Sequence, residues 1–409
     1  MNALKIGVIG VGGRGRGMIK SVLLNMPDVE VVAICDEYAD RVEAVADLVV
    51  ERGGKRPITY TDHMQLLAHE GIEAVYVATS WETHVEVAID ALKKGIPVAL
   101  EVGGAYSIER LWDMVRAYET TKTPLMFMEN CCFGKQELMV TAMVRAGLLG
   151  EIVHCNGAYA HYLAEEIAQG EEKRHYRLRN YLNRNCENYP THELGPIAKI
   201  LNINRGNQMI SLVSMASKSV GMEDFIRQHA EEYPHLVGKK FRQGDMVSTL
   251  IYCADGSTIS LRLDTTLPRS YSREFNIHGT RGIYEMNTHT VCLADQPECF
   301  DTTKFYRENF GNADNYADKY LPPIWKNMSE EQKKIGHGGM DGIEFRVFVD
   351  TLRAGKPMPI DVYDAAAWMC ISALSEASIA AGGLPQAIPD FTGGMWTRRA
   401  PADVIDLGL

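Results

Sequence analysis

Residues 187–196, with the sequence ENYPTHELGP, bring a tyrosine and a histidine together at the start of a predicted helix that runs on through residues 197–206. A histidine side chain ordinarily has a pKa of about 6.5, so His192 could take up a proton and return it. Tyr189 could hydrogen-bond to the same group or orient His192. His192 could equally be a surface residue, a helix cap or a metal ligand. The spacing predicts an acid–base pair and leaves these alternatives open.

A second pair lies in the alternating segment EIVHCNGAYAHYL, residues 151–163. Side chains two positions apart on a strand point to the same face, so Tyr159 and His161 would lie side by side. They could transfer protons together, or they could be half-buried residues of a sheet. The twelve histidines form no HxxxH or HxH pattern with acids, and the nine cysteines form no CxxC pair. The sequence therefore predicts no metal site.

The glycine-rich stretch IGVIGVGGRGRG predicts a dinucleotide-binding turn. Gly10, Gly12 and Gly15 form G-x-G-x-x-G between a predicted strand and a predicted helix, which is the context that this motif requires. The free N–H groups of the helix start would hold the phosphates. Asp36 ends the second predicted strand, where a carboxylate binds the ribose hydroxyls and favours NAD over NADP. Arg14 and Arg41 lie close enough to leave NADP open.

The elements that must position these residues follow two patterns. Up to about residue 130, short apolar runs rich in Val and Ile alternate with helical stretches such as residues 41–53 and 84–95. This pattern predicts βαβ units, hence a doubly wound parallel (Rossmann) sheet in an α/β protein. After about residue 150, period-2 runs joined by glycine turns predict a C-terminal α+β domain with an open, mostly antiparallel sheet. Residues 301–337 read as a long ordered loop, and helices return over residues 340–355 and 364–383.

The domain boundaries predicted from this pattern are 1–130 for the dinucleotide-binding domain and 131–362 for the substrate and oligomerisation domain. Residues 363–409 would form a C-terminal helix and tail that pack back on the first domain. The length of 409 residues suits about two domains.

Composition excludes several classes of partner. The net charge of −11 gives no electrostatic reason to expect nucleic acid or an anionic membrane as a partner. The chain has no apolar run long enough to span a bilayer and no signal-like start, so we expect a cytoplasmic protein, with a periplasmic one possible if an export signal was removed.

The whole pattern resembles the Gfo/Idh/MocA superfamily of sugar oxidoreductases. The stretch ATSWETHVEVAIDALKKGIPVALEV is similar to the superfamily's segment after the fourth strand, and by this resemblance Thr79, Trp81 and His84 line the nicotinamide side. Where the superfamily's dehydrogenases carry Glu-Lys-Pro, this chain has Glu101, Val102 and Gly103, so the proton-transfer lysine is missing. Their Asp-x-x-x-His becomes Asn188 to His192, which keeps the histidine and loses the acid.

Six separated motifs resemble one branch of this superfamily, glycoside hydrolase family 109. Members of that family are NAD-dependent α-N-acetylgalactosaminidases. These motifs are MENCCFG, GAYAHYL, NYPTHELGPIAKILNINRG, GHGGMD, DVYDAAAW and PDFTGGMW. The resemblance implies a glycosidase in which NAD takes a hydride from C3 of the sugar. C2 then loses its proton, the C1 substituent is eliminated, water adds, and the hydride returns. NAD-dependent glycosidases are known exceptions to the two-carboxylate rule.

The resemblance also implies roles for individual residues. His192 would be the base on the C3 hydroxyl, with Tyr189 bonding or orienting it. Tyr159 would transfer the C2 proton, and His161 would lie near the leaving group. The predicted cofactor residues are Gly10, Gly12, Gly13, Arg14, Gly15, Asp36, Thr79, Trp81, His84, Glu101 and Asn130. The predicted substrate residues are Glu129, Arg177, Tyr271 and His337, with Arg269 and Arg273 near Tyr271. From their place in GHGGMD, His337 and Asp341 could either cap a helix or close the pocket.

The alternative function is an NAD(P)-dependent sugar or inositol dehydrogenase of the same superfamily, and a non-catalytic sensor is a third. The expected partner is a small-molecule glycoside, and the resemblance implies a homo-oligomer, either a dimer or a tetramer.

Overall fold

The structure is a computed structural model that describes residues 2–300 and 306–409. The chain divides into two compact units. Unit 1 comprises residues 1–133 and 327–366, and unit 2 comprises residues 134–326 and 367–409. Residues 301–305, part of the predicted loop, lie outside the described residues.

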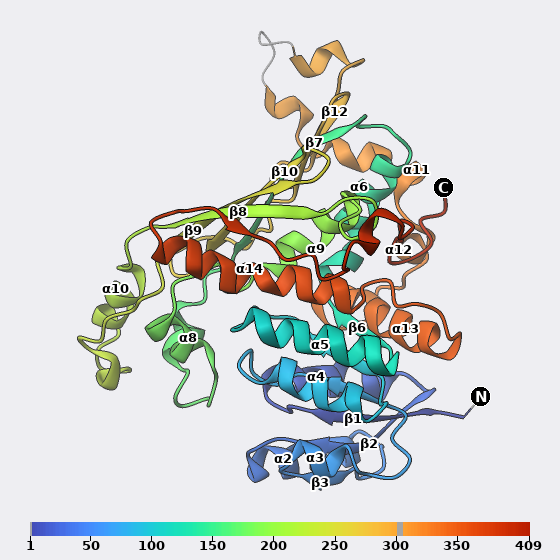
Figure 1. Cartoon of the computed structure of the whole chain (residues 1–409), viewed down its shortest axis with the longest axis vertical. Coiled ribbons are helices and arrows are strands. Elements are labelled where there is room, and N and C mark those ends of the chain that lie inside the picture. Colours follow the sequence, from blue (N-terminus) through green and yellow to red (C-terminus); the bar gives the residue numbers. More distant parts are fainter. Residues whose placement is uncertain (1, 301–305) are drawn as a thin grey trace. The chain divides into compact units, whose positions relative to one another are not determined.

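Unit 1 is built on a six-stranded parallel sheet with the order β3-β2-β1-β4-β5-β6. Its strands are short and almost wholly apolar, as expected for strands buried on both faces. Helices α4 and α5 lie side by side along it (Figure 1). Its elements are β1 (Leu4–Ile9), α1 (Gly13–Ser21), η1 (Leu23–Asn25), β2 (Val29–Cys35), α2 (Ala39–Glu51), β3 (Ile58–Tyr60), α3 (His63–Leu66), β4 (Ala74–Val77), α4 (His84–Lys93), β5 (Val98–Glu101), α5 (Ile108–Thr121), β6 (Leu125–Met128), η2 (Asn130–Phe133), η7 (Gln332–Lys334), η8 (His337–Gly339) and α13 (Met340–Arg353).

Residues far along the chain complete this unit. The N–H group of Phe127 donates to the carbonyl of Ile360 at 2.9 Å, and the ring of Phe345 packs edge-on against Tyr76, with 5.9 Å between centroids. Arg346 and Arg353 both pair with Asp28. The second segment of unit 1 is therefore part of the dinucleotide-binding fold.

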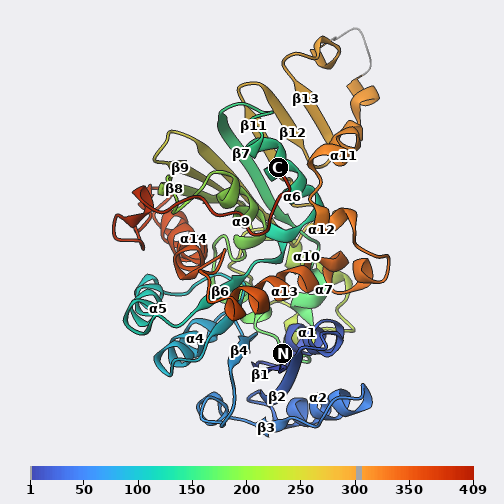
Figure 2. The same cartoon turned by 90° about the vertical axis from the view of Figure 1, so that its right-hand side faces the viewer.

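Unit 2 is built on an eight-stranded sheet with the order β13-β12-β11-β7-β10-β9-β8-β14, of which Figure 2 shows β7, β11, β12 and β13 next to one another. Its strand pairs are antiparallel except for β7 with β10. Its elements are α6 (Lys135–Arg145), β7 (Ile152–Ala160), α7 (Ala164–Ala168), α8 (Arg177–Asn183), α9 (Thr191–Ile200), β8 (Met209–Ala216), α10 (Gly221–Gln228), η3 (Pro234–Leu236), β9 (Met246–Cys253), β10 (Thr258–Asp264), β11 (Asn276–Gly279), β12 (Gly282–Glu285), β13 (Thr290–Leu293), η4 (Pro297–Phe300), η5 (Tyr306–Asn309), η6 (Asn312–Tyr316), α11 (Ala317–Tyr320), α12 (Pro323–Lys326), β14 (Gln386–Ala387) and η9 (Met395–Thr397).

Helix α14 (Val362–Ala380) begins in unit 1 and ends in unit 2. Its central residues, including Trp368 and Cys370, are fully buried, as its nearly all-round apolar sequence predicts. Among the described residues, we find no helix with the length and apolar character that a membrane crossing requires.

The predicted fold class is confirmed, with two local corrections. The stretch from residue 306 onward, expected as a long ordered loop, is a series of short helical turns, in which Gly311 and Gly336 each precede a turn and Leu321 follows one. These turns are too short for a helical repeat to be visible in the sequence. The helix expected from about Tyr189 begins at Thr191, and Pro190 is its N-cap.

Candidate active site

The glycine turn of unit 1 shows which glycines the fold itself requires. Gly10 has φ +90°, and a Cβ there would lie 2.5 Å from the carbonyl oxygen of Ala78. A Cβ on Gly15 would collide with the carbonyl oxygen of Gly10. Gly12 and Gly13 are different, since a Cβ on Gly12 would meet only Arg41 at 3.6 Å and one on Gly13 would meet nothing within 4 Å. The turn is closed on the strand side and open in front of the helix start, which fits the close approach of a phosphate.

Asp36 is held at the end of β2 with its carboxylate already placed. Its two oxygens accept hydrogen bonds from the backbone N–H groups of Val11, at 3.0 Å, and Tyr38, at 3.1 Å. The Arg41 guanidinium lies 3.8 Å from the same carboxylate and over the Tyr38 ring. A fixed carboxylate here fits ribose hydroxyls and disfavours a 2′-phosphate.

Arg14, whose position raised the NADP question, is committed to partners within unit 1. Its guanidinium donates to Glu101 at 2.8 Å and makes two bonds to Asp341, at 2.8 and 3.1 Å. Tyr76 donates to the same oxygen of Glu101 at 2.5 Å. These bonds leave Arg14 poorly suited to bind a 2′-phosphate.

Asp341 lies in the first turn of α13 and is the centre of this network. It also accepts from Asn130 at 2.8 Å and contacts Nδ1 of His337 at 2.9 Å. Burial alone would raise the pKa of Asp341, but the hydrogen bond with His337 and the charge of Arg14 outweigh burial and lower it. The sequence suggested a helix cap or a pocket residue for Asp341; in the structure it joins α1, η2 and α13 through its bonds with Arg14 and Asn130.

Sequence reasoning missed a buried acid beside this network. Glu344, one turn along α13 from Asp341, is fully buried, and neither carboxylate oxygen has a hydrogen-bond partner. Burial raises the pKa of Glu344 well above its ordinary value, and the negative charges of Glu101 and Asp341 raise it further. The only signal for Glu344 in the sequence is its spacing from Asp341, which places both acids on the same side of the helix.

The residues after β4 pack closely together at the start of α4. His84, the first residue of α4, is fully buried, neither ring nitrogen has a hydrogen-bond partner, and burial lowers its pKa to about 4. The hydroxyl of Thr79 is buried and has no partner. A Cβ on Gly103 would overlap the Trp81 ring and come within 2.8 Å of His84. Glycine at 103 therefore lets Trp81 and His84 pack against the strand end, and the partnerless Thr79 hydroxyl fits a site that is completed by a ligand.

Glu129 and Asn130 follow the last strand of the unit 1 sheet. Glu129 is fully buried and accepts from the N–H group of Cys131 at 3.1 Å. Both residues lie at the carboxyl end of β6, which is the edge where open parallel sheets bind ligands.

In unit 2 the structure brings together the two predicted tyrosine–histidine pairs. The rings of Tyr159 and Tyr189 have centroids 4.6 Å apart, and the His192 ring lies 5.6 Å from Tyr159. The Tyr159 hydroxyl is 3.3 Å from Nδ1 of His161, and the Tyr189 hydroxyl is 3.4 Å from Nε2 of His192. Each tyrosine thus has a histidine as its hydrogen-bond partner.

The sheet and the helix approach closely enough to make this cluster possible because of Gly157 on β7. A Cβ at this position would lie 2.7 Å from Cβ of Glu193 and 3.0 Å from Ile197, both on α9. Glycine therefore allows α9 to lie directly on β7. This contact brings His192, in the first turn of α9, beside Tyr159.

Two cations flank the cluster. The Arg177 guanidinium lies 5.3 Å from the Tyr189 ring centroid and pairs with Glu166 at 2.7 Å. Burial raises the pKa of the Tyr159 hydroxyl, and the charge of Arg177 only partly opposes this, so Tyr159 keeps its proton at neutral pH. Arg273 lies over the Tyr271 ring and donates to buried Glu137 at 2.7 Å.

Tyr271 borders the cluster on its exposed side, since its ring lies 5.0 Å from His161 and is 48% exposed. Arg269, by contrast, pairs with Asp264 and Glu274. The side chains of Tyr159, His161, Tyr189, His192, Arg177 and Tyr271 therefore form one connected group within unit 2, which we call the tyrosine–histidine cluster.

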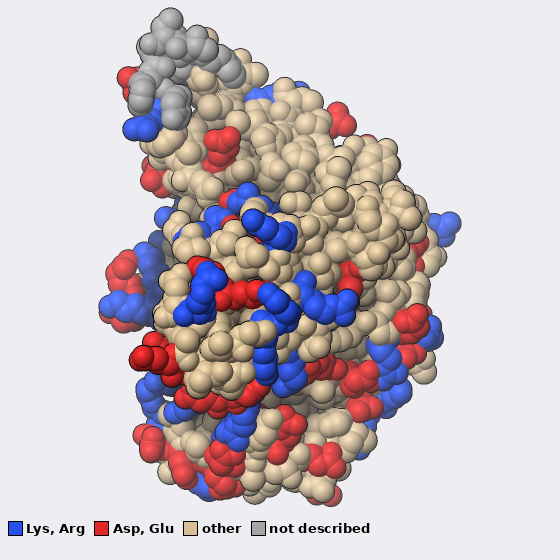
Figure 3. Space-filling view, turned by 90° about the vertical axis from the view of Figure 1, so that its left-hand side faces the viewer, with Lys and Arg blue, Asp and Glu red and all other residues tan. Residues whose placement is uncertain are grey.

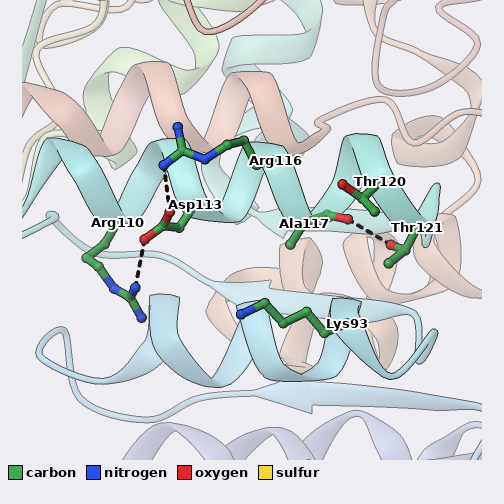
Figure 4. Close-up of a pocket in the computed structure, with 7 residues that line it drawn as sticks. All are labelled: Lys93, Arg110, Asp113, Arg116, Ala117, Thr120 and Thr121. Atoms are coloured by element: carbon green, nitrogen blue, oxygen red, sulfur yellow. Dashed lines mark hydrogen bonds and ion pairs between the residues drawn. The ribbon is translucent and has the colours of Figure 1, made fainter.

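A surface hollow of about 410 Å³ lies elsewhere, between α4 and α5 (Figure 4). Two of the three cations that line it are paired, since Asp113 pairs with both Arg110 and Arg116. None of the predicted site residues lines it. On the face shown in Figure 3, Lys and Arg side chains are interspersed with Asp and Glu.

Family models match both parts of the chain. Residues 4–128 match the oxidoreductase family with an NAD-binding Rossmann fold, and residues 133–398 match the glycosyl hydrolase 109 C-terminal domain. The chain belongs to glycosyl hydrolase family 109. The family assignment makes the protein an NAD-dependent glycoside hydrolase and confirms the resemblance drawn from the six motifs.

Curated relatives match over nearly the full length. An alpha-N-acetylgalactosaminidase of Tannerella forsythia is 36% identical, over 98% of this chain and 88% of that protein. A glycosyl hydrolase family 109 protein of Stenotrophomonas maltophilia is 34% identical, over 98% of this chain and 92% of that protein.

Solved structures share the fold at lower identity. A levoglucosan dehydrogenase in complex with NADH and L-sorbose has a TM-score of 0.69 at 17% identity, covering 95% of this chain and 100% of that one. An oxidoreductase of Agrobacterium radiobacter in complex with NAD+ has a TM-score of 0.65 at 18% identity, covering 95% and 99%. The domain that binds NAD in this chain has the same Rossmann fold.

Proposed function

We propose that this family 109 protein hydrolyses α-N-acetylgalactosaminides through transient oxidation of the sugar at C3. The observation that carries the proposal is the tyrosine–histidine cluster, which offers two proton-transfer pairs and no pair of carboxylates, together with a unit 1 turn that fits NAD. When bound, NAD supplies the reversible oxidation that makes the proton on C2 acidic. The name of the Tannerella forsythia relative supports the choice of sugar.

The His192 pair would act on the C3 hydroxyl. His192 accepts the hydroxyl proton as C3 is oxidised and returns it at the end of the reaction. The neighbouring Tyr189 hydroxyl, 3.4 Å from Nε2, orients the ring and can share the proton. A positioned base of this kind contributes about 10²–10⁴-fold to a rate.

The Tyr159 pair would act on C2 and on the leaving group. Because Tyr159 keeps its proton at neutral pH, its oxygen can accept the C2 proton only as its own proton passes to His161, 3.3 Å away. His161 would then hold a proton for the departing C1 oxygen, and water would add as the sequence reverses. Arg177 stabilises negative charge on the Tyr159 oxygen.

The test uses purified protein, a nitrophenyl α-N-acetylgalactosaminide and heavy water. We expect nitrophenol release with deuterium at C2 of the sugar product and no lasting NADH absorbance. Lasting NADH without nitrophenol would instead make the protein a dehydrogenase. Release without deuterium at C2 would exclude the elimination route and leave a hydrolase of another mechanism.

A further inference from the structure

The segment that leads into the tyrosine–histidine cluster, residues 186–189, is held by a buried amide on a distant part of the chain. Gln243, which is 2% exposed, contacts this segment at three points. Its Oε1 accepts from the N–H group of Cys186 at 3.3 Å and from Nδ2 of Asn188 at 3.1 Å. Its Nε2 donates to the carbonyls of Cys186, at 3.0 Å, and Gly244, at 3.3 Å.

These contacts fix the orientation of the Gln243 amide. A reversed amide would point its NH₂ group at the N–H of Cys186 and its oxygen at two carbonyl oxygens, so all three backbone bonds would be lost. Oε1 must therefore face Asn188. An oxygen that faces position 188 requires a hydrogen-bond donor there, which the Asn188 amide supplies and a carboxylate cannot.

The next residue along the segment is pinned separately. The N–H group of Glu187 donates to the Ser375 hydroxyl at 2.8 Å, and the Ser372 hydroxyl donates to the carbonyl of Glu187 at 2.6 Å. Asn188 also hydrogen-bonds with the buried Tyr181 hydroxyl. Tyr189 follows directly and His192 lies three residues further on, so the geometry of the cluster depends on these buried polar attachments.

We propose that Gln243 and Asn188 are positioning residues for Tyr189 and His192, and that their contact, here called the amide clasp, requires a hydrogen-bond donor at position 188. The effect on catalysis rests on the proposed function above. The donor requirement rests only on the hydrogen bonds of unit 2.

Asn188→Asp is the variant that tests the donor requirement, because it keeps the shape and removes the donor. At pH 7.5 we expect kcat to fall by up to about 100-fold, since a small misplacement of catalytic groups can have an effect of that size. The dissociation constant of NAD and the unfolding temperature serve as controls. Asn183→Asp is the matched control variant, because Asn183 is exposed and only donates to the carbonyl of Arg179.

The pH profile distinguishes positioning from general damage. Burial raises the pKa of the introduced carboxyl group above the ordinary value of about 3.9. A protonated carboxyl can donate to Gln243 Oε1, so kcat relative to the wild type should recover by about 10-fold or more between pH 7.5 and pH 5. The titratable groups around it are Tyr181, which contacts Asn188, and the adjacent Glu187. Asn188→Leu cannot donate at any pH and should show no recovery.

Two results would overturn the proposal: wild-type kcat for Asn188→Asp at pH 7.5, or a loss of kcat that does not change with pH. If the wild type itself releases no nitrophenol, the proposed function fails and the amide clasp is judged by hydrogen exchange. Peptides covering residues 184–194 should then exchange faster in Asn188→Asp than in the wild type at pH 7.5, and the difference should shrink at pH 5. Equal exchange at both pH values would refute the donor requirement.

Discussion

The His84 side chain is tuned by burial alone. His84 has no exposed surface and no hydrogen-bond partner, and burial lowers its pKa to about 4. A neutral imidazole is therefore built into the wall formed with Trp81 and Gly103, while the same residue takes up a proton readily in the unfolded chain.

This difference predicts a loss of stability in acid. Because the folded pKa lies below the unfolded value of about 6.5, the unfolded state binds more protons, and the free energy of unfolding falls as pH drops from 6.5 towards 4. The loss attributable to His84 is roughly 3 kcal/mol across this window. Urea denaturation of the wild type and of His84→Asn would measure it, with a flatter pH dependence expected for the variant. Identical pH slopes would contradict the assignment.

The tyrosine–histidine cluster predicts separable half-reactions. His192→Ala should lose the transient NADH signal and nitrophenol release together, each by about 10²–10⁴-fold, because oxidation at C3 needs this base. Tyr159→Phe should retain C3 oxidation and lose deuterium uptake at C2. Stopped-flow absorbance and mass spectrometry of the sugar would distinguish the two. Loss of C3 oxidation in Tyr159→Phe would assign the roles differently.

The glycine turn lies between the short elements β1 and α1. Two of its glycines are required by the fold, and two others leave space that a ligand would fill. Gly15→Ala would place a methyl group on the carbonyl of Gly10, whereas Gly13→Ala would enter open space at the start of α1. We expect the Gly15 variant to lower the unfolding temperature. The Gly13 variant should keep the unfolding temperature of the wild type and bind NAD about 10-fold more weakly, or worse.

Calorimetric titration with NAD and thermal unfolding of both variants make the measurement. Because alanine is the better helix former by about 1 kcal/mol, the Gly13 substitution does not weaken α1, and a loss of NAD affinity in this variant is not a loss of folding. Wild-type NAD affinity in that variant would show that no phosphate approaches this part of the turn.

Much of this element-scale picture could be predicted from the sequence. The turn of Gly10 to Gly15 and the pair Tyr159 and His161 depend on local spacing, which fixes glycine geometry and strand faces directly. Gln243, Ser372 and Ser375 could not be found in this way, because their partners at 186–188 lie 55 or more residues away in the chain. The tie from Arg14 to Asp341 spans 327 residues.

At the scale of the whole molecule, NAD binding should stabilise the fold selectively. At a concentration 100 times its dissociation constant, NAD should add about 2.7 kcal/mol to the free energy of unfolding. NADP at equal concentration should add less, because Asp36 repels a 2′-phosphate and Arg14 is held by Glu101 and Asp341. Thermal unfolding with each dinucleotide measures this, and equal shifts would refute the predicted preference.

The discontinuity of unit 1 has a consequence for how the protein is made. A ribosome releases residues 1–133 first, but the contacts of Phe127 with Ile360 and of Arg14 with Asp341 must wait for more than two hundred further residues. Unit 2, by contrast, has nearly all of its sheet in one uninterrupted segment. During translation the NAD-binding unit therefore begins first and is completed late. Its six strands all precede residue 133, so the sheet waits for the segment 327–366 that packs on it and is the part of the nascent chain that depends most on protection from aggregation.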